Sequence, residues 1–460
     1  MTGEAGAERV RLADILRGRR GRFLATLMLA EFAAAMQGIA YSTVLPVTAR
    51  DLDGFALFGA TLAGGSVAAV LMLSFTAPIL QRVPPVRVLL AATALYVVGA
   101  GLAVFAPAMT WVLAGTVIRG VAAGLFGGFG LGAIGTLYDE AERTRVFGLF
   151  ALIWLLPSVL GPPLNAMITD WIGWRWALAW PAVLVVLARI LMGTTISAVP
   201  WTPERDRVPV SAGAGVTVAA ALAVGGWGST TSSIWGMAAL AIGAGVAGFA
   251  IVAFLVRGTR GEARVLIAFA LLCAAFFGAY ELLSLTIIEG LGSTVLIASV
   301  AVTGGLLAWS LVGLKPRPDA RPDRAVAGSV LVAGAFVLLI LGLWLGGSGG
   351  IVTVIAGAVM AGAGMGAAYP LLSSESFTGS TAASTIGTMV AFAEIAATAW
   401  VALLAGGAYS ALHSIGRPPA QALQIVFALV SVIAVASVVC TTRRRGTSVD
   451  RVAQPLPDQA

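Results

Sequence analysis

Fourteen long apolar segments, separated by short polar or charged ones, dominate the sequence. A helix that crosses a bilayer needs about 20 mostly apolar residues. Hydrophobic residues make up 59 % of the chain and charged residues 11 %, whereas a soluble domain has about 25 % charged residues, so one water-soluble core cannot bury these segments. The sequence therefore predicts an all-α polytopic membrane protein. Its spans are expected at 22–46, 55–79, 86–106, 110–136, 145–169, 175–196, 209–226, 232–256, 264–288, 292–313, 325–346, 351–372, 383–408 and 419–441.

The basic residues predict the orientation. With the N-terminus in the cytoplasm, 23 of the 28 Lys and Arg residues fall in segments on the inside and three on the outside. Such a bias is typical of cytoplasmic loops and tails. We therefore expect both termini to be cytoplasmic, and the bias toward Arg, Ala and Gly suggests a bacterial plasma membrane.

Several classes of function are disfavoured by what the sequence contains. Two cysteines, Cys273 and Cys440, and one histidine, His413, are too few for a disulfide framework or a histidine metal cluster. The sequence has no G-x-x-x-x-G-K-[ST] phosphate loop, so uphill transport would need a gradient. It also lacks an acid–histidine cluster of the kind that an intramembrane enzyme needs. We expect no enzyme activity, no metal or other cofactor and no nucleic acid partner.

Short motifs in a consistent order resemble those of a known family. They are Ser42–Pro46 leading to Asp51–Leu52, Arg119–Gly120, Glu142–Gly148, Gly161–Pro162 and Trp174–Trp176. Together they resemble the major facilitator superfamily, and specifically its fourteen-helix drug:proton antiporter branch. One departure lies in the loop after the second span, where Gln81 precedes Arg82 in place of the family's acidic residue.

The resemblance implies a major facilitator fold of two six-helix bundles plus two inserted helices. The expected units are a cytoplasmic segment 1–21, a bundle 22–196, the inserted pair 197–262, a bundle 263–441 and a cytoplasmic tail 442–460. It also implies alternating access in a monomer, with conformational roles for Arg82, Gly120, Gly124, Gly161 and Pro162.

The implied function is proton-driven export of hydrophobic or cationic small molecules. Export of a lipid or cell-envelope intermediate stays open as an alternative, and a polytopic membrane enzyme is less favoured.

The chain repeats part of its own pattern. The pattern of the fourth and fifth spans recurs at 357–394, with a run of spaced glycines followed by a polar link. Many secondary transporters consist of two related halves with the site at their interface. In the fourth span, Gly120, Gly124, Gly128 and Gly132 form a small-x-x-x-small ridge, which predicts close helix packing.

Charged residues inside the spans are the main site candidates, because each costs about 2.5–3.5 kcal/mol at a helix centre on insertion scales. Counting from the span ends places Glu31 and Arg119 at similar depth, where they can pair. We expect Glu31, Arg119 and Glu394 to couple protons, and Glu281 and Glu394 to attract a cation. A structural ion pair, or a hydroxyl partner for a carboxyl, is the alternative.

Weaker candidates complete the set. Aromatic residues that can line a cavity are Tyr41, Phe126, Trp154 and Tyr280. Arg189 is interpreted as a side chain that snorkels toward the interface. Glu289 is interpreted as a solvated residue and His413 as an exposed loop residue.

Overall fold

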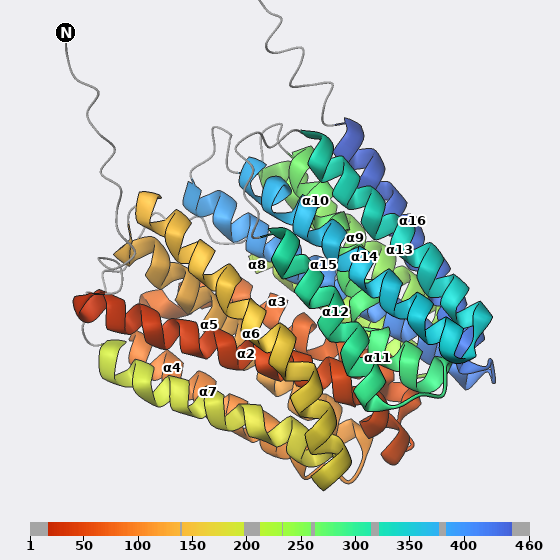
Figure 1. Ribbon diagram of the computed structural model, residues 1–460. Helices are drawn as coiled ribbons and strands as arrows, with labels where there is room; N and C mark the ends of the chain where they lie inside the picture. The colour runs from red at the N-terminus through yellow and green to blue at the C-terminus, as the bar shows by residue number, and fades with distance from the viewer. Residues whose placement is uncertain are drawn as a thin grey trace, which may run out of the picture.

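The structure, a computed structural model, is a bundle of long helices (Figure 1). It describes residues 17–138, 140–196, 212–231, 233–258, 263–313, 322–376 and 383–443. The long helices of the first half are α2 (Gly18–Asp51), α3 (Phe58–Arg82), α4 (Pro85–Val104), α5 (Met109–Leu137), α6 (Glu140–Ile172) and α7 (Trp174–Ile196). Then come α8 (Ala212–Ser229) and α9 (Ile234–Gly258). Those of the second half are α10 (Ala263–Tyr280), α12 (Val295–Gly313), α13 (Pro322–Leu345), α14 (Gly347–Glu375), α15 (Ala383–Ser414) and α16 (Pro419–Arg443).

Each apolar segment of the sequence corresponds to one of these helices. Within the described ranges, 13 helices are long and apolar enough to cross a membrane, and α6 is the remaining long helix. No strand occurs in these ranges. Three short elements complete the set: η1 (Phe55–Leu57), α11 (Leu283–Leu285) and η2 (Thr286–Gly290). The prediction of an all-α polytopic membrane protein is confirmed.

Two helices, α2 and α15, continue past their predicted C-terminal ends by at least five residues. The first span does not end at Pro46 but continues to Asp51, because a proline is tolerated inside a membrane helix when neighbouring groups satisfy the freed backbone. The thirteenth span continues to Ser414, so His413 lies in its last turn rather than in a loop. There the His413 ring packs against Tyr409, with the ring centroids 5.8 Å apart.

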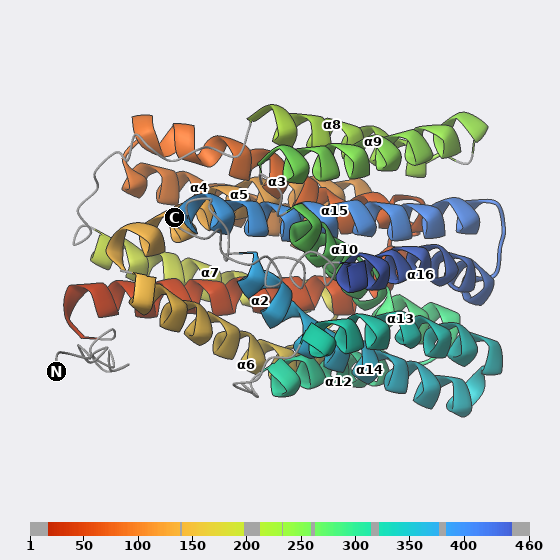
Figure 2. The ribbon, with the colours of Figure 1, turned by 90° about the horizontal axis from the view of Figure 1, so that it is seen from above.

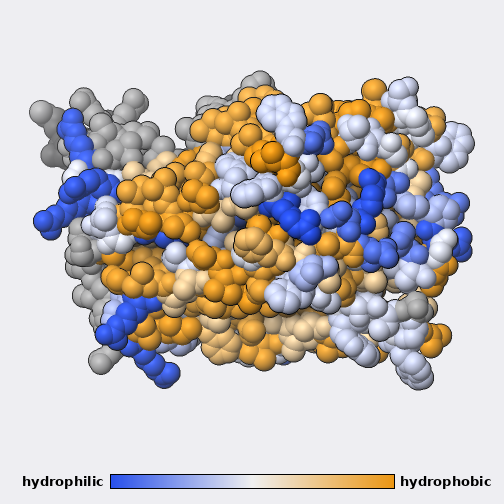
Figure 3. All heavy atoms as spheres, turned by 90° about the horizontal axis from the view of Figure 1, so that it is seen from below, coloured by the Kyte–Doolittle hydropathy of each residue, from blue (hydrophilic) through white to orange (hydrophobic). Residues whose placement is uncertain are grey.

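The outer surface is apolar, as a membrane requires. Large apolar side chains that are more than half exposed include Phe105, Trp171, Trp235, Phe249 and Trp344. Figure 3 shows apolar residues over much of one face, with hydrophilic residues at its left edge and in a band from its middle to its right side. In water such a surface would aggregate, whereas in a bilayer it faces lipid chains.

The two halves repeat one packing pattern. In the first half, α5 packs against α3 and α4, and α2 packs against α6 and α7. In the second half, α14 packs against α12 and α13, and α10 packs against α15 and α16. The repeated sequence pattern lies on α5 and α6 in the first half and on α14 and α15 in the second. These helices therefore occupy equivalent positions.

Glycines make the equivalent contacts in both halves. A Cβ on Gly120 would overlap the carbonyl of Gly65 on α3, and a Cβ on Gly362 would overlap that of Gly305 on α12. One turn later, Gly124 approaches α3 in the same way. The predicted close packing through the glycine ridge is confirmed, because any side chain there would separate the helices.

The pair α8 and α9 lies at the seam between the halves. The two helices pack on each other, and both contact α15, while α8 also contacts α3 and α9 contacts α10 (Figure 2). The Trp400 indole of α15 donates a 2.8 Å hydrogen bond to the Ala244 carbonyl of α9. This bond fixes α9 against the second half.

The halves come together where α2 ends, α3 begins and α15 ends (Figure 1). The Gly59 amide donates to Ser410 Oγ over 3.1 Å, and that hydroxyl donates to the Phe55 carbonyl over 3.0 Å. A Cβ on Gly59 would overlap the backbone of Gly406, so α3 and α15 approach each other closely only because both residues are glycine. We call these contacts, with those of Tyr409 and His413 against Phe55, the junction.

An ion pair adds to the junction. Arg50 at the end of α2 pairs with Glu289 in η2. The Glu289 side chain is only 14 % exposed, so the interpretation of Glu289 as a solvated residue is wrong. The sequence could not reveal this contact, because the partners are 239 residues apart.

Gly406→Val is expected to prevent close approach of the halves. The added side chain meets α3 backbone, and overpacking of this kind costs about 1–3 kcal/mol. Spin labels on the exposed Asp53 and Ile415 should then show longer distances across the junction. The control is Gly38→Val, where a Cβ meets open space. An unchanged distance distribution for Gly406→Val contradicts the role of the junction.

Candidate functional site

Glu394 on α15 is anchored by a tyrosine of a neighbouring helix. The Tyr369 hydroxyl on α14 donates a 2.9 Å hydrogen bond to Glu394 Oε2. The Tyr369 ring in turn packs against Phe269 on α10, with centroids 5.1 Å apart, and against Trp309 on α12, at 5.7 Å. Four helices of the second half thus meet around this carboxylate.

A continuous row of aromatic rings leads from Glu394 to Glu281. Trp309 contacts Phe276 at 5.2 Å, and Phe276 stacks on Tyr280 at 5.8 Å. Tyr280 immediately precedes Glu281 in the chain. We call Tyr369, Trp309, Phe276 and Tyr280 the aromatic row. The two carboxylates predicted to attract a cation therefore lie near opposite ends of one row of packed rings, in which Phe276 and Tyr280 are buried.

The helix that carries Glu281 is broken at this residue. A single helix over 264–288 was predicted, but α10 ends at Tyr280, and the chain continues through α11 and the wide turn η2. Wide turns of this kind occur often at functional sites. α11 packs against α2 of the first half, so the break brings Glu281 to the boundary between the halves.

The first half contributes a buried arginine. The Arg119 guanidinium lies 3.6 Å from the centre of the Tyr41 ring, and the residue is 8 % exposed. Tyr96 beside it donates a hydrogen bond to Gln37. Within the described part of the chain, Arg119 Nε has no hydrogen-bond partner. A buried cation on an aromatic face with an unused donor is able to bind an incoming acceptor.

The structure favours Arg189 over Arg119 as the neighbour of Glu31. Arg119 contacts Tyr41, which is ten residues after Glu31 on α2, or about 15 Å along a helix. Arg189 on α7 lies close enough to interact electrostatically with Glu31.

Arg189 has guanidinium atoms that are buried, although the residue as a whole is partly exposed. Its guanidinium lies 3.0 Å from the centre of the Phe126 ring. Its Nε and Nη1 atoms are buried and have no hydrogen-bond partner among the described residues. The signal for Arg189 in the sequence is a charge inside an apolar span, but the helix register did not reveal which way the side chain points.

A double-mutant cycle is expected to couple Glu31 to Arg189 and not to Arg119. Glu31→Gln combined with Arg189→Gln should show an interaction energy of at least about 1 kcal/mol in the stability of the purified protein, as contacting residues do. Glu31→Gln with Arg119→Gln should be additive within about 0.5 kcal/mol, because the residues are far apart. The opposite pattern would restore the pairing predicted from the sequence.

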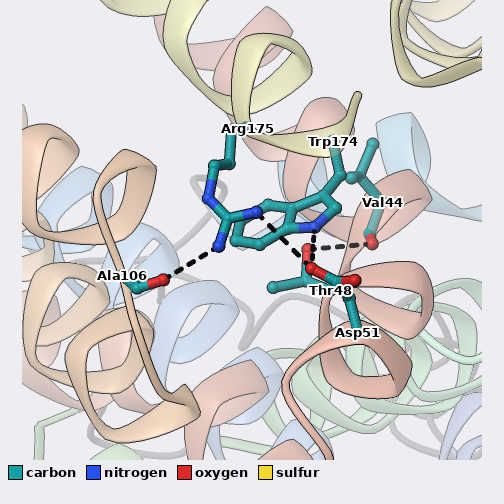
Figure 4. Close-up of polar contacts among 6 residues, drawn as sticks. All are labelled: Val44, Thr48, Asp51, Ala106, Trp174 and Arg175. Atoms are coloured by element: carbon teal, nitrogen blue, oxygen red, sulfur yellow. Dashed lines mark hydrogen bonds and ion pairs between the residues drawn. The ribbon is translucent and has the colours of Figure 1, made fainter. Parts of the chain in front are cut away.

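Two motifs that lie far apart in the sequence meet at the end of α2. Asp51 Oδ2 accepts hydrogen bonds from Trp174 Nε1 at 2.8 Å and from Arg175 Nη1 at 3.4 Å (Figure 4). Arg175 Nη2 also donates to the Ala106 carbonyl over 3.1 Å. This cluster ties the ends of α2, α4 and α7 together, so these motif residues hold the first half in shape.

The remaining predicted residues have simpler surroundings. Gly161 on α6 faces Ile39 on α2, and Pro162 lies inside the continuous α6. Arg82 is exposed at the end of α3. The side chains of Trp154 and Gln81 lie outside the described residues. In the ranges that the structure describes, no group of three or more His, Cys, Asp or Glu residues is arranged to hold a metal ion.

The fold and this site define a membrane transporter with two related halves. The model of the Major Facilitator Superfamily matches residues 27–405, so the chain belongs to this superfamily. Among solved structures, it is similar to a POT family transporter in complex with 5-aminolevulinic acid, with a TM-score of 0.66, 16 % identity and coverage of 93 % of this chain and 98 % of that one. At this identity the similarity concerns the fold.

Three curated relatives are more similar in sequence over shorter ranges. A triacylglyceride transporter of Mycobacteroides abscessus is 29 % identical over 266 residues, 54 % of this chain and 49 % of that one. Multidrug resistance protein 3 of Bacillus subtilis is 27 % identical over 150 residues, 33 % of this chain and 29 % of that one. An uncharacterised transporter of the same superfamily from Mycobacterium tuberculosis is 32 % identical over 167 residues, 35 % of this chain and 24 % of that one. The chain thus matches between a quarter and a half of each relative.

Proposed function

We propose that the protein is a proton-coupled antiporter that exports hydrophobic or cationic small molecules by alternating access. The observation that carries this proposal is the aromatic row with a carboxylate at each end. In the second half, Glu394 and Glu281 supply the negative charge that attracts a cation, and the packed rings of the aromatic row connect the two positions. The multidrug resistance relative in Bacillus subtilis supports the same substrate class.

Proton and substrate compete for the same carboxylate in this proposal. A cationic compound binds beside the ionised Glu394, because a charge in a low-dielectric site needs a counter-charge. When a proton neutralises the carboxylate, the cation loses its partner and leaves. Tyr369 positions Glu394 in the ionised state by donating to it.

Glu31 serves in this proposal as the coupling residue of the first half. Arg189 lies within electrostatic reach of Glu31, and Glu31 also interacts with Glu394 of the other half. Protonation of Glu31 therefore changes the electrostatic potential at both Arg189 and Glu394. This links the proton to the state of the substrate site across the boundary between the halves.

The junction defines the conformation in this proposal. With both termini in the cytoplasm, the contacts of Arg50, Gly59, Glu289 and Gly406 close the outer side. Substrate then enters from the cytoplasm or the inner leaflet. Opening the junction and closing the opposite end exposes the site to the outside, and no energy source beyond the proton gradient is needed.

We expect fourteen spans in a bacterial plasma membrane with both termini cytoplasmic. Reporter fusions after Ser229, at the end of α8, should read outside, and fusions after Gly258, at the end of α9, should read inside. The excess of arginine in the inside segments is the physical reason. If both fusions read cytoplasmic, α8 and α9 do not cross, and the orientation assigned to the inserted pair is wrong.

Lipid export is the second candidate. It is favoured by the triacylglyceride transporter relative, which matches this chain over 266 residues. The two candidate functions differ in the charge of the substrate, since a neutral lipid needs no counter-charge from Glu394. Export of a triacylglyceride that is unaffected by Glu394→Gln would favour this alternative.

An accumulation assay tests the proposed function. A bacterial host that lacks its own efflux systems is loaded with a lipophilic fluorescent cation, with and without this protein. We expect accumulation to fall by about tenfold, equivalent to about 1.4 kcal/mol of uphill work, and to recover when a protonophore collapses the gradient. Equal accumulation in both hosts over a panel of cations contradicts the proposal.

A further inference from the structure

An apolar groove lies outside the site, on the side of the second half that faces the inserted pair. It runs between α9, α10 and α15 and has a volume of about 290 Å³. Its mouth is formed by the exposed Gly245, Phe249 and Val252, and Ala270 and Ala397 form its floor. Among the lining residues the side-chain polar atom is the Trp400 indole nitrogen, which is already bonded to Ala244. The groove therefore offers apolar contact and no free polar partner.

The shape of the groove suits a flexible chain. Its lining residues on α9 extend from Ala244 to Leu255, which is about 16 Å along the helix and about half of the hydrocarbon thickness of a bilayer. Near the Leu255 end, Phe254 packs against Phe392 with ring centroids 4.7 Å apart. The walls belong to spans, so the mouth opens to acyl chains rather than to water.

The floor of the groove lies close to Glu394. Ala397 follows Glu394 by three residues, about one turn, on α15. Ala270 precedes Cys273 by the same spacing on α10, and Cys273 interacts electrostatically with Glu394. Alanine at both floor positions keeps the side chains small at the seam between α10 and α15.

We propose that this groove is an entry site that holds the alkyl chain of an amphiphilic cation coming from the bilayer. The cationic head group then reaches Glu394 across the seam between α10 and α15. The groove fits this occupant because its walls are apolar and Glu394 lies one turn from its floor residue Ala397 on α15. The inference rests on the proposed function for its cation, and it gives the inserted helix α9 a role in admitting substrate.

Photolabelling tests the groove without requiring transport. The probe is decyltrimethylammonium with a diazirine on its terminal chain carbon, added to the full chain in proteoliposomes. Peptides from α9, α10 and α15 should be labelled, and unlabelled decyltrimethylammonium should compete while tetramethylammonium should not. Gly245→Phe should lower this labelling by at least about tenfold, because a side chain at Gly245 meets open space and fills the mouth.

The matched control is Gly193→Phe on α7. Gly193 is also an exposed helical glycine with open space around it, but it lies far from the groove in the other half. Labelling should be unchanged in this variant. If ordinary bilayer lipid fills the groove instead, the probe should label the exposed faces of α4, α7 and α9 equally, and Gly245→Phe should not change that labelling. That result overturns the inference.

Transport of the same series separates this inference from the proposed function. Gly245→Phe should lower export of decyltrimethylammonium by about tenfold and change export of a short-chain cation by less than about twofold. Equal loss of both contradicts the groove and leaves the proposed function intact. Labelling of the groove without export of any cation by the unmodified protein contradicts the proposed function and leaves the groove intact.

Discussion

Glu394→Gln is expected to lower export of a cationic compound by at least about thirtyfold, while export of a neutral compound of similar size changes by less than about threefold. Removing one member of a buried charge pair costs about 2–5 kcal/mol, mainly because the other charge is left without a partner. Gln keeps the shape of the side chain and can still accept from Tyr369, so packing around the α10–α15–α14 contact is preserved. The measurement is initial export rate for a matched cationic and neutral pair in proteoliposomes.

Two control variants bracket this result. Tyr369→Phe removes the hydrogen bond to Glu394, and losing one such bond costs about 1.5–3 kcal/mol. The charge preference should survive, because the carboxylate is still present. Asp170→Asn removes an exposed carboxylate near the end of α6 and should change nothing. Equal loss for the cation and the neutral compound in Glu394→Gln would show that this residue has no role in charge preference.

Glu31→Gln is expected to abolish proton-driven uphill transport of every substrate. The neutral amide carries no proton through the cycle, and it no longer changes the field at Arg189. Binding of substrate and downhill exchange should persist, because the aromatic row and Glu394 are untouched. Accumulation against a gradient, measured beside substrate exchange in the same vesicles, distinguishes these activities.

The control for Glu31 is its shorter homologue. Glu31→Asp retains a titratable carboxyl at the same position on α2 and should retain part of the uphill transport. Asp170→Asn should again behave as the unmodified protein. Uphill transport by Glu31→Gln at a normal rate would assign proton coupling to another group.

The spans were predictable because apolar length is a local property of the sequence. Every predicted segment corresponds to a helix, and the glycine ridge containing Gly120 and Gly124 packs as the spacing indicated. Helix ends were less predictable, since α2 and α15 extend past the apolar segments to make contacts with other parts of the chain. Asp51 contacts Trp174, and His413 contacts Phe55, at positions that a local pattern cannot reveal.

The candidate site was only partly predictable. A charge within an apolar span identified Glu281, Glu394 and Arg119 as unusual, because such a charge is costly wherever it points. The partners were not predictable, since Tyr369, Trp309 and Phe276 come from three different helices and look like ordinary apolar-span aromatics. The proximity of Arg189 to Glu31 was not predictable for the same reason, because the two residues lie on different helices.

Simultaneous measurement of protons and substrate in proteoliposomes tests the central proposal most directly. Purified protein is reconstituted with a pH-sensitive dye inside the vesicles, and a lipophilic cation is added with no imposed pH gradient. We predict that entry of the cation drives protons out, that the proton signal scales with cation flux, and that Glu31→Gln moves the cation without any proton signal. Cation flux by the unmodified protein with no accompanying proton movement would contradict the account.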